Sequence, residues 1–164
     1  MATSAISRER LTTLFLELVR LDSHSRKEHL MATRLTRELQ ELGAEVWTDD
    51  AGAKVGGTTG NVLARVKGTS PAEPLLLSAH MDTVIPGEGV QPIVEGDVIR
   101  TDGSTVLGGD DKSGCAIICE VVRVLRDAAI PHGDIEIAFT ICEEVGLLGA
   151  KHLDVSKITA RAGL

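Results

Sequence analysis

The sequence has few aromatic residues and a shortage of positive charge, and these two deficits exclude nucleic acid as a partner. Only three of the 164 residues are aromatic (Phe15, Trp47 and Phe139), so there is no stacking platform for single-stranded nucleic acid. Basic residues number 17 against 24 acidic ones, which gives a formal net charge of −7. An acidic chain lacks the positive surface that a phosphate backbone requires.

Long apolar runs and cysteines are also scarce. No apolar run approaches the roughly 20 residues that span a bilayer. Arg8, Glu9, Arg10 and Glu17 interrupt the N-terminal region where a secretory signal would lie. The chain has three Cys, an odd and low number, which favours a reducing compartment over a disulfide framework. These absences predict a cytoplasmic protein with no membrane partner.

What remains is the composition of a folded domain. Apolar residues make up 43% of the chain and charged residues 25%, and a chain of this length buries roughly 70% of its unfolded surface. Helical and strand-like patterns alternate, which predicts an α/β fold with a mixed, mostly parallel central sheet and helices on both faces. Helices are predicted at residues 7–21, about 26–42, 111–129 and about 146–153, and strands at 44–48, 61–67, 75–77, 93–94, 98–99 and 134–141.

Local signals refine these boundaries. Ser25 and Glu28 match a capping box at the start of the second helix, and Gly43 is expected to end it. Residues 51–60, rich in Gly and Thr, are expected to form a loop.

Two short polar motifs lie where ligands collect in α/β sheets, at the carboxyl ends of strands. His80 and Asp82, two residues apart after an apolar strand, project to the same side. Asp82 could fix the imidazole tautomer and leave the other nitrogen for a metal, or the pair could be an ordinary polar strand end. Asp110 and Asp111 precede a predicted helix, where they could bind a metal or simply cap the helix.

Glu143 and Glu144 form a third motif, directly after the strand at 134–141. At a turn both side chains can reach one cavity, where one could bind a metal and the other could hold a water proton; the alternative is a solvated loop. Together with His80 and Asp110 they suit two divalent ions roughly 3.5–4 Å apart. Mixed nitrogen and oxygen donors favour zinc, with manganese or cobalt as alternatives.

Three stretches together resemble one protein family. SAHMDTV, TDGSTVLGGDDKSG and FTICEEVGLLGAKHLDV are similar to motifs of the co-catalytic zinc metallopeptidases, the M-twenty peptidases, and within them to the peptidase T-like branch. The resemblance covers essentially the whole chain, and residues 57–68 and 90–99 also fit it. It implies a zinc exopeptidase-like catalytic domain with two zinc ions, a short peptide substrate and a homodimeric full-length form.

The resemblance also implies a role for each motif residue. His80 corresponds to the ligand of one zinc, Asp82 to the acid that orients it, Asp110 to the bridging ligand, and Glu144 to a ligand of the second zinc. Glu143 corresponds to the general base, which takes a proton from a water bridging both zincs and delivers it to the leaving amine. The implied reaction is tripeptide aminopeptidase-like hydrolysis. A dipeptidase, a carboxypeptidase or an N-acyl amino acid deacylase would show the same motifs.

The ligand count is short for that family. Its remaining ligands are an acid in the strand expected just after residue 164 and a His near the far C-terminus. We therefore expect residues 1–164 to be the N-terminal portion of the catalytic domain, without the inserted dimerisation domain and inactive alone. The alternative is a non-catalytic metal-binding or interaction module. The three thiols, Cys115, Cys119 and Cys142, are expected to be buried rather than metal ligands.

Overall fold

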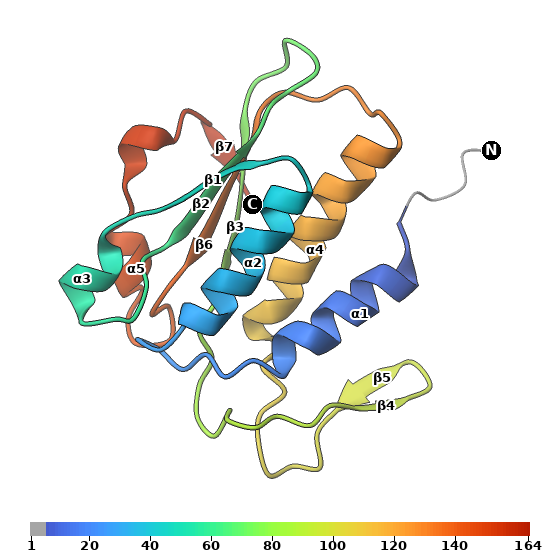
Figure 1. Cartoon of the computed structure of the whole chain (residues 1–164), viewed down its shortest axis with the longest axis vertical. Coiled ribbons are helices and arrows are strands. Elements are labelled where there is room, and N and C mark those ends of the chain that lie inside the picture. The colour runs from blue at the N-terminus through green and yellow to red at the C-terminus, as the bar shows by residue number, and fades with distance from the viewer. Residues whose placement is uncertain (1–5) are drawn as a thin grey trace.

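A five-stranded sheet in the order β1-β2-β6-β3-β7 runs through the middle of the molecule in the computed structural model, which describes residues 6–164 (Figure 1). β2 is antiparallel to both β1 and β6, whereas β3 is parallel to both β6 and β7. Four strands therefore point the same way and only β2 is reversed, which confirms the predicted mixed, mostly parallel sheet. The strands are β1 (Glu45–Thr48), β2 (Val62–Val66), β3 (Leu75–His80), β6 (Ile135–Thr140) and β7 (Ala162–Gly163).

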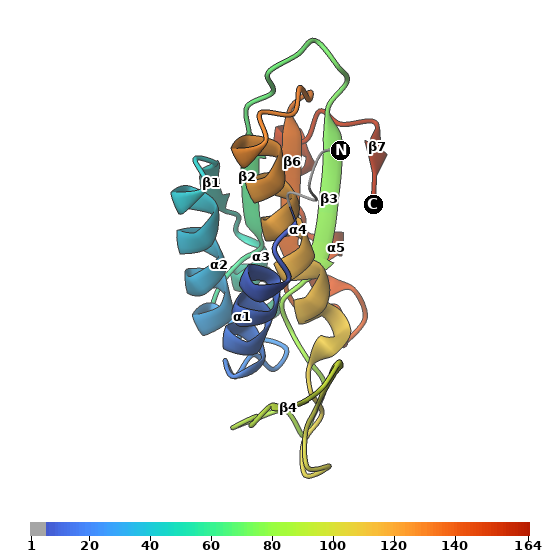
Figure 2. The same ribbon diagram turned by 90° about the vertical axis from the view of Figure 1, so that its right-hand side faces the viewer.

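Helices cover both faces of this sheet, but unequally (Figure 2). The longer helices α1 (Arg8–Val19), α2 (His29–Glu41) and α4 (Gly109–Asp127) lie on one side; α2 packs on β1 and β2, and α4 packs on β3 and carries α1. The short α3 (Ala51–Val55) and α5 (Leu148–Lys151) lie on the other side. None of the helices in residues 6–164 is long and apolar enough to cross a membrane.

The pleat of the strands explains this division. In β6, Ile135, Ile137 and Phe139 point into the main apolar core with α2 and α4, as alternation along a strand requires. The residue between the first two, Glu136, faces the opposite side, where it accepts hydrogen bonds from Arg65 and from the segment at Thr159. All six residues of β6 are buried, because it lies at the centre of the sheet between β2 and β3.

Two local predictions are wrong. α2 begins at His29, and Ser25 and Glu28 form no capping box: the Ser25 hydroxyl donates to Asp82 instead, and Glu28 provides no side-chain cap to the helix. The segment predicted as loop contains α3. Asp49 accepts a hydrogen bond from the N–H of Ala51 at its start, and five residues are too few to show helical periodicity. The predicted end of α2 is confirmed, since Gly43 has a φ of +86°.

A small hairpin stands apart from the main sheet, at the end where α4 begins (Figures 1 and 2). Its strands are β4 (Ile93–Glu95) and β5 (Val98–Arg100), which pair with each other only. The hairpin was predicted from the sequence. An exposed ion pair between Arg8 and Asp97 links its turn to α1.

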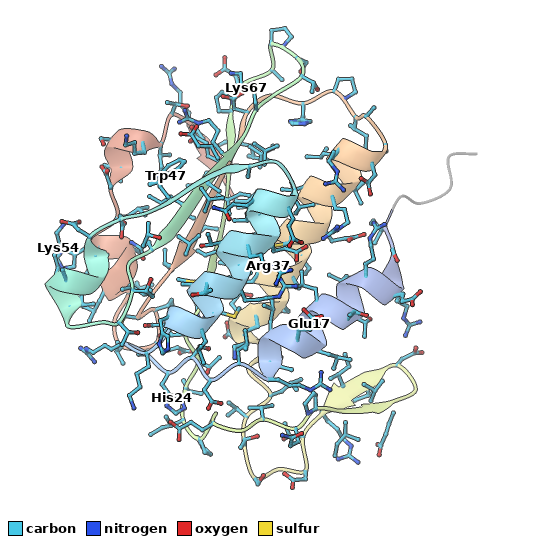
Figure 3. The ribbon with its side chains drawn as sticks, viewed as in Figure 1. Glu17, His24, Arg37, Trp47, Lys54 and Lys67 are labelled. Atoms are coloured by element: carbon cyan, nitrogen blue, oxygen red, sulfur yellow. The ribbon has the colours of Figure 1, made fainter. Side chains whose placement is uncertain are left out.

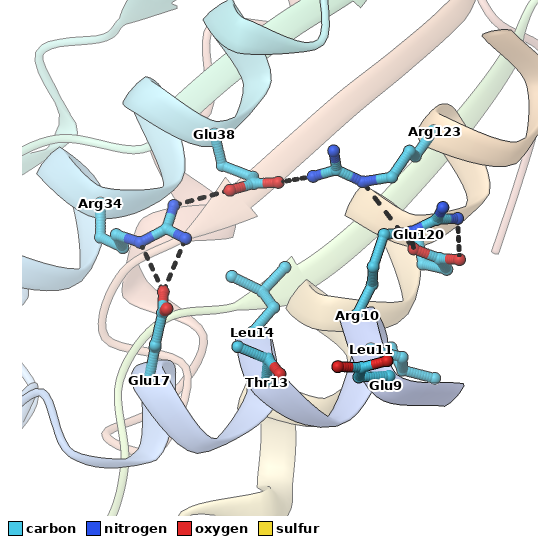
Figure 4. Close-up of a pocket in the computed structure, with 10 residues that line it drawn as sticks. All are labelled: Glu9, Arg10, Leu11, Thr13, Leu14, Glu17, Arg34, Glu38, Glu120 and Arg123. Atoms are coloured by element: carbon cyan, nitrogen blue, oxygen red, sulfur yellow. Dashed lines mark hydrogen bonds and ion pairs between the residues drawn. The ribbon is translucent and has the colours of Figure 1, made fainter. Parts of the chain in front are cut away.

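Charged side chains join the three helices of the thick layer (Figure 4). Glu38 of α2 is nearly buried and is paired with Arg34, at 2.8 Å, and with Arg123 of α4. Arg34 also reaches Glu17 of α1, at 2.8 Å, so the pairs connect α1, α2 and α4. Other charged side chains are exposed to solvent, such as Arg37 on α2 and Lys54 on α3 (Figure 3).

The three cysteines are buried, as predicted. Burial raises the pKa of Cys115 well above its ordinary value and raises the pKa of Cys119 and of Cys142 to about 12, and the thiolate is the reactive form. We expect iodoacetamide at pH 8 to label none of them in the native chain and all three in denaturant. Mass spectrometry after each treatment measures this; rapid native labelling would contradict the packing.

Candidate metal centre

His80, Asp110 and Glu144 come together at one edge of the sheet. His80 ends β3, Asp110 lies at the start of α4, and Glu144 follows β6. Since β3 and β6 are parallel neighbours, their carboxyl ends lie side by side, and α4 begins at the same end of the molecule (Figure 1). One donor atom from each of the three residues lies within 4.8 Å of the other two. No other group of three or more His, Cys, Asp or Glu donors in residues 6–164 has this geometry.

The His80 ring faces an oxygen on each side. Its Nδ1–H donates to the backbone carbonyl of Asp82, at 2.8 Å, while the Asp82 carboxylate is 3.6 Å away. Its Nε2 lies 3.0 Å from Oδ1 of Asp110 and 3.9 Å from Oε2 of Glu143. Fixing one ring nitrogen on a carbonyl leaves the other toward the carboxylates, which is how metal-binding imidazoles are held.

Asp82 is fully buried and holds the backbone of the loop after β6. Its carboxylate accepts hydrogen bonds from the N–H of Glu143 at 2.9 Å, the N–H of Glu144 at 3.2 Å and the Ser25 hydroxyl at 2.6 Å. Burial alone would raise the pKa of Asp82, but the nearby His80 ring together with the hydrogen bonds from Ser25 and these two amides outweighs burial and lowers it. Asp82 is thus an ionised support for both the ring and the loop.

Asp110 and Asp111 have separate environments. The Asp110 side chain is 87% exposed and turned to His80. The Asp111 carboxylate accepts a hydrogen bond from the N–H of Gly114, at 3.0 Å, in the first turn of the regular part of α4. The capping alternative therefore applies to Asp111, whereas Asp110 turns away from the helix to His80, because the backbone at Asp110 and Asp111 is not helical. The next residue, Lys112, is buried and donates to the Leu21 carbonyl, at 2.6 Å, as a structural contact.

The charges at this edge suit a bound cation. Burial raises the pKa of Glu144, and the negative charges of Glu143, Asp110 and Asp82 add to this, while His80 opposes it. Burial by itself would lower the pKa of His80, but the hydrogen bonds to Asp82 and Asp110 outweigh burial and raise this pKa to about 9. Several carboxylates around one imidazole repel each other, and a bound divalent cation would reduce this repulsion. The residues present therefore fit a metal ion.

Two residues to which the sequence assigned no role at the site, Asn61 and Glu28, help Asp82 to hold the loop that carries Glu143 and Glu144. Four consecutive amides, from Ile141 to Glu144, donate to side chains rather than to backbone. Asp82 accepts the last two, Asn61 accepts the amide of Ile141 at 3.0 Å, and Glu28 accepts the amide of Cys142 at 3.0 Å. Asn61 stands at a predicted strand start and Glu28 in a pattern typical of a helix cap, so neither has a local signal for this role.

The remaining four histidines lie outside this group of donors. His24 lies in the segment between α1 and α2 at the same end of the molecule (Figure 3) and lines a cavity together with Glu144. Its Nδ1 lies 3.2 Å from Oε1 of Glu88, and it forms a β-bridge with Thr83. It therefore belongs to the wall beside the three donors.

Comparison with known proteins places this edge in context. The model of Peptidase family M28 matches residues 61–161. The YqjE protein of Bacillus subtilis (strain 168) is 44% identical over 158 residues, which are 96% of this chain and 43% of that protein. Peptidase T of Escherichia coli (strain K12) is 56% identical over 64 residues, 39% of this chain and 15% of that protein. These relatives confirm the expected resemblance to peptidase T-like metallopeptidases.

Solved structures agree with these relatives. Aminopeptidase PepT from Bacillus cereus ATCC 10987 superposes with a TM-score of 0.94 and 42% identity, over 98% of this chain and 43% of that one. A tripeptidase from Staphylococcus aureus superposes with a TM-score of 0.93 and 38% identity, with the same coverage of both chains. The chain thus spans less than half the length of the full-length relatives that it matches from end to end.

Proposed function

Because the chain belongs to peptidase family M28, we propose that it supplies part of the centre of a metallopeptidase that removes the N-terminal residue of short peptides. The observation that carries this proposal is the meeting of His80, Asp110 and Glu144 within 4.8 Å at the edge where β3 and β6 end. The printed names of the similar structures, an aminopeptidase and a tripeptidase, support short peptides as the substrate class.

In this proposal each residue has one task. His80 and Glu144 would each hold an ion and Asp110 would be the ligand shared between them, with zinc as the metal and manganese or cobalt as substitutes. When bound, such ions make water a nucleophile at neutral pH and polarise the scissile carbonyl. Asp82 orients His80 and, through its backbone hydrogen bonds, the loop that carries the two glutamates.

Glu143 is the proposed general base. Its carboxylate oxygen is 3.9 Å from Nε2 of His80, and its side chain is 35% exposed, so it borders the donors and also reaches solvent. In this position it takes the proton of the attacking water and delivers it to the leaving amine, which then departs as a neutral group.

Three protein donors are too few for two ions, so the proposed site needs ligands beyond His80, Asp110 and Glu144. The matched relatives are more than twice as long as this chain, and we propose that the corresponding further length supplies those ligands. The homodimeric full-length form and the cytoplasmic location stay predictions.

Metal binding tests the site directly. We expect the chain to bind Co²⁺ or Zn²⁺, and His80→Ala to weaken this binding by at least about tenfold because a nitrogen donor is lost. Isothermal titration with Zn²⁺ and the visible spectrum of the Co²⁺ form measure it, with His132→Ala, in a turn outside the donor group, as the matched control. Equal affinity in the wild-type chain and in His80→Ala would overturn the proposed site.

A further inference from the structure

Glu28 is a completely buried carboxylic acid with no cationic partner among the ion pairs of residues 6–164. Its Oε1 accepts hydrogen bonds from the N–H of Arg26 at 2.9 Å, the N–H of Cys142 at 3.0 Å and the Cys142 thiol at 3.4 Å. Its Oε2 has no partner in the described part of the chain. Burying a carboxyl group costs free energy, so packing alone does not explain why a Glu occupies this position.

Capping α2 is not that reason. Glu28 occupies the N-cap position of α2, but its side chain makes no capping hydrogen bond. The carboxyl points away from the helix, to a residue 114 positions later in the sequence. Its contacts therefore join the segment before α2 to the end of β6.

The residue that Glu28 holds has an unusual backbone. Cys142 has a φ of +53°, in the left-handed region that residues other than Gly enter rarely. This conformation turns the chain at the end of β6, so that the next two residues, Glu143 and Glu144, leave the sheet and face His80. The N–H groups of those two residues are held by Asp82, whereas the N–H of Cys142, at the turn before them, is held by Glu28.

The same segment also supports Asp82. Ser25, three residues before Glu28, donates its hydroxyl to Oδ2 of Asp82 at 2.6 Å. The carbonyl of Ser23 accepts the N–H of Thr83 at 3.0 Å. Residues 23–28 thus support Asp82 and its neighbour Thr83 and also supply Glu28, the member of the segment that contacts the loop itself.

We infer that Glu28 is a positioning residue for the centre: through the amide and thiol of Cys142 it fixes the turn that brings Glu143 and Glu144 to His80 and Asp110. The inference rests on the proposed function of those glutamates. A side chain that accepts the N–H of Cys142 keeps the turn in place. One that cannot accept it removes the bond that fixes the peptide between Ile141 and Cys142.

Three substitutions separate this role from simple packing. Glu28→Gln keeps the acceptor oxygen and the length, Glu28→Met keeps the length without an acceptor, and Glu28→Asp keeps a carboxyl that is too short to reach Cys142. Leu35→Ala, at a fully buried position of α2, is the matched control because it destabilises the same layer without touching the loop. All are measured in the 164-residue chain, by amide hydrogen exchange and by Zn²⁺ titration.

We expect Glu28→Met and Glu28→Asp to lose exchange protection at Cys142, Glu143 and Glu144 and to bind Zn²⁺ about tenfold to 100-fold more weakly, as loss of support for metal ligands does elsewhere. We expect Glu28→Gln and Leu35→Ala to keep both properties. If Glu28→Met does not fold, the comparison of Glu28→Asp with Glu28→Gln decides.

Two results would overturn the inference: unchanged protection of the loop in Glu28→Asp, or the same local loss in Leu35→Ala. Failure of the proposed function gives a different result. If the wild-type chain bound no Zn²⁺ while the loop still lost its protection in Glu28→Asp, the metal assignment would be wrong, and Glu28 would still be the residue that orders the loop.

Discussion

Replacing Glu143 by Gln should lower the turnover of a short peptide by about 10²- to 10⁴-fold while metal binding is retained, because the amide cannot take up the proton of the attacking water. The substitution preserves size, and the loop does not depend on this side chain: Asp82 holds the backbone N–H of Glu143. The three donors His80, Asp110 and Glu144 are untouched. The measurement is kcat with a tripeptide, in a form of the protein that includes the further ligands proposed above and is active as a peptidase. The metal content of the same sample is measured alongside.

Glu144→Gln is the matched comparison for this experiment. It changes the neighbouring side chain by the same atoms, but removes a carboxylate from the donor group, so we expect metal content to fall along with turnover. Unchanged turnover in Glu143→Gln would refute its role as the general base. Loss of metal in both variants would mean that Glu143 acts as a ligand.

Removing the carboxylate of Glu38 should have the largest effect on stability among the ion pairs of α2. Glu38→Ala is expected to lower the free energy of unfolding by about 2–3 kcal/mol. Loss of one partner of a fully buried pair costs about 3–5 kcal/mol, but Arg34 and Arg123 are about a quarter exposed and recover part of that from water. The carboxylate joins α2 to α4 and, through Arg34, to Glu17 of α1 (Figure 4).

Urea denaturation followed by circular dichroism measures this difference. Glu41→Ala is the control in the same helix: Glu41 also pairs with an arginine four residues away, but both side chains of that pair are more than half exposed. Exposed pairs of this kind contribute little to stability, because water screens them and both side chains lose freedom on pairing. Equal losses in Glu38→Ala and Glu41→Ala would show that burial adds nothing to the Glu38 network.

The elements that could be predicted from the sequence are those whose pattern is long or strongly apolar. α1, α4 and β6 bury residues at the spacing that helices and strands require. α3 and β7 were not predicted, because five and two residues contain too little periodicity. β7 exists only because its backbone pairs with Leu75 and Leu76 of β3, residues that are far from it in the sequence.

The candidate centre shows the same division. The types and order of the motif residues indicated that His80, Asp110 and Glu144 share a site, and the fold brings them together. The residues alone left open whether Asp110 and Asp111 bind a metal or cap the helix, and only the family resemblance assigned Asp110 to the site. That choice depends on the non-helical backbone at the start of α4, which directs one carboxylate to His80 and the other to the helix.

The sequence by itself therefore determined which chemical groups are available: an acidic chain with few aromatics, three polar motifs at strand ends, and an alternation of helices and strands that forms one sheet. Only the tertiary structure decided what holds those groups in place. Glu28 and Asn61 bond to amides that lie 114 and 80 residues away. The physical reason is that periodicity and local turn signals report a residue's neighbours within a few positions, whereas the partner of a buried polar side chain is set by which strands pair and where their ends meet.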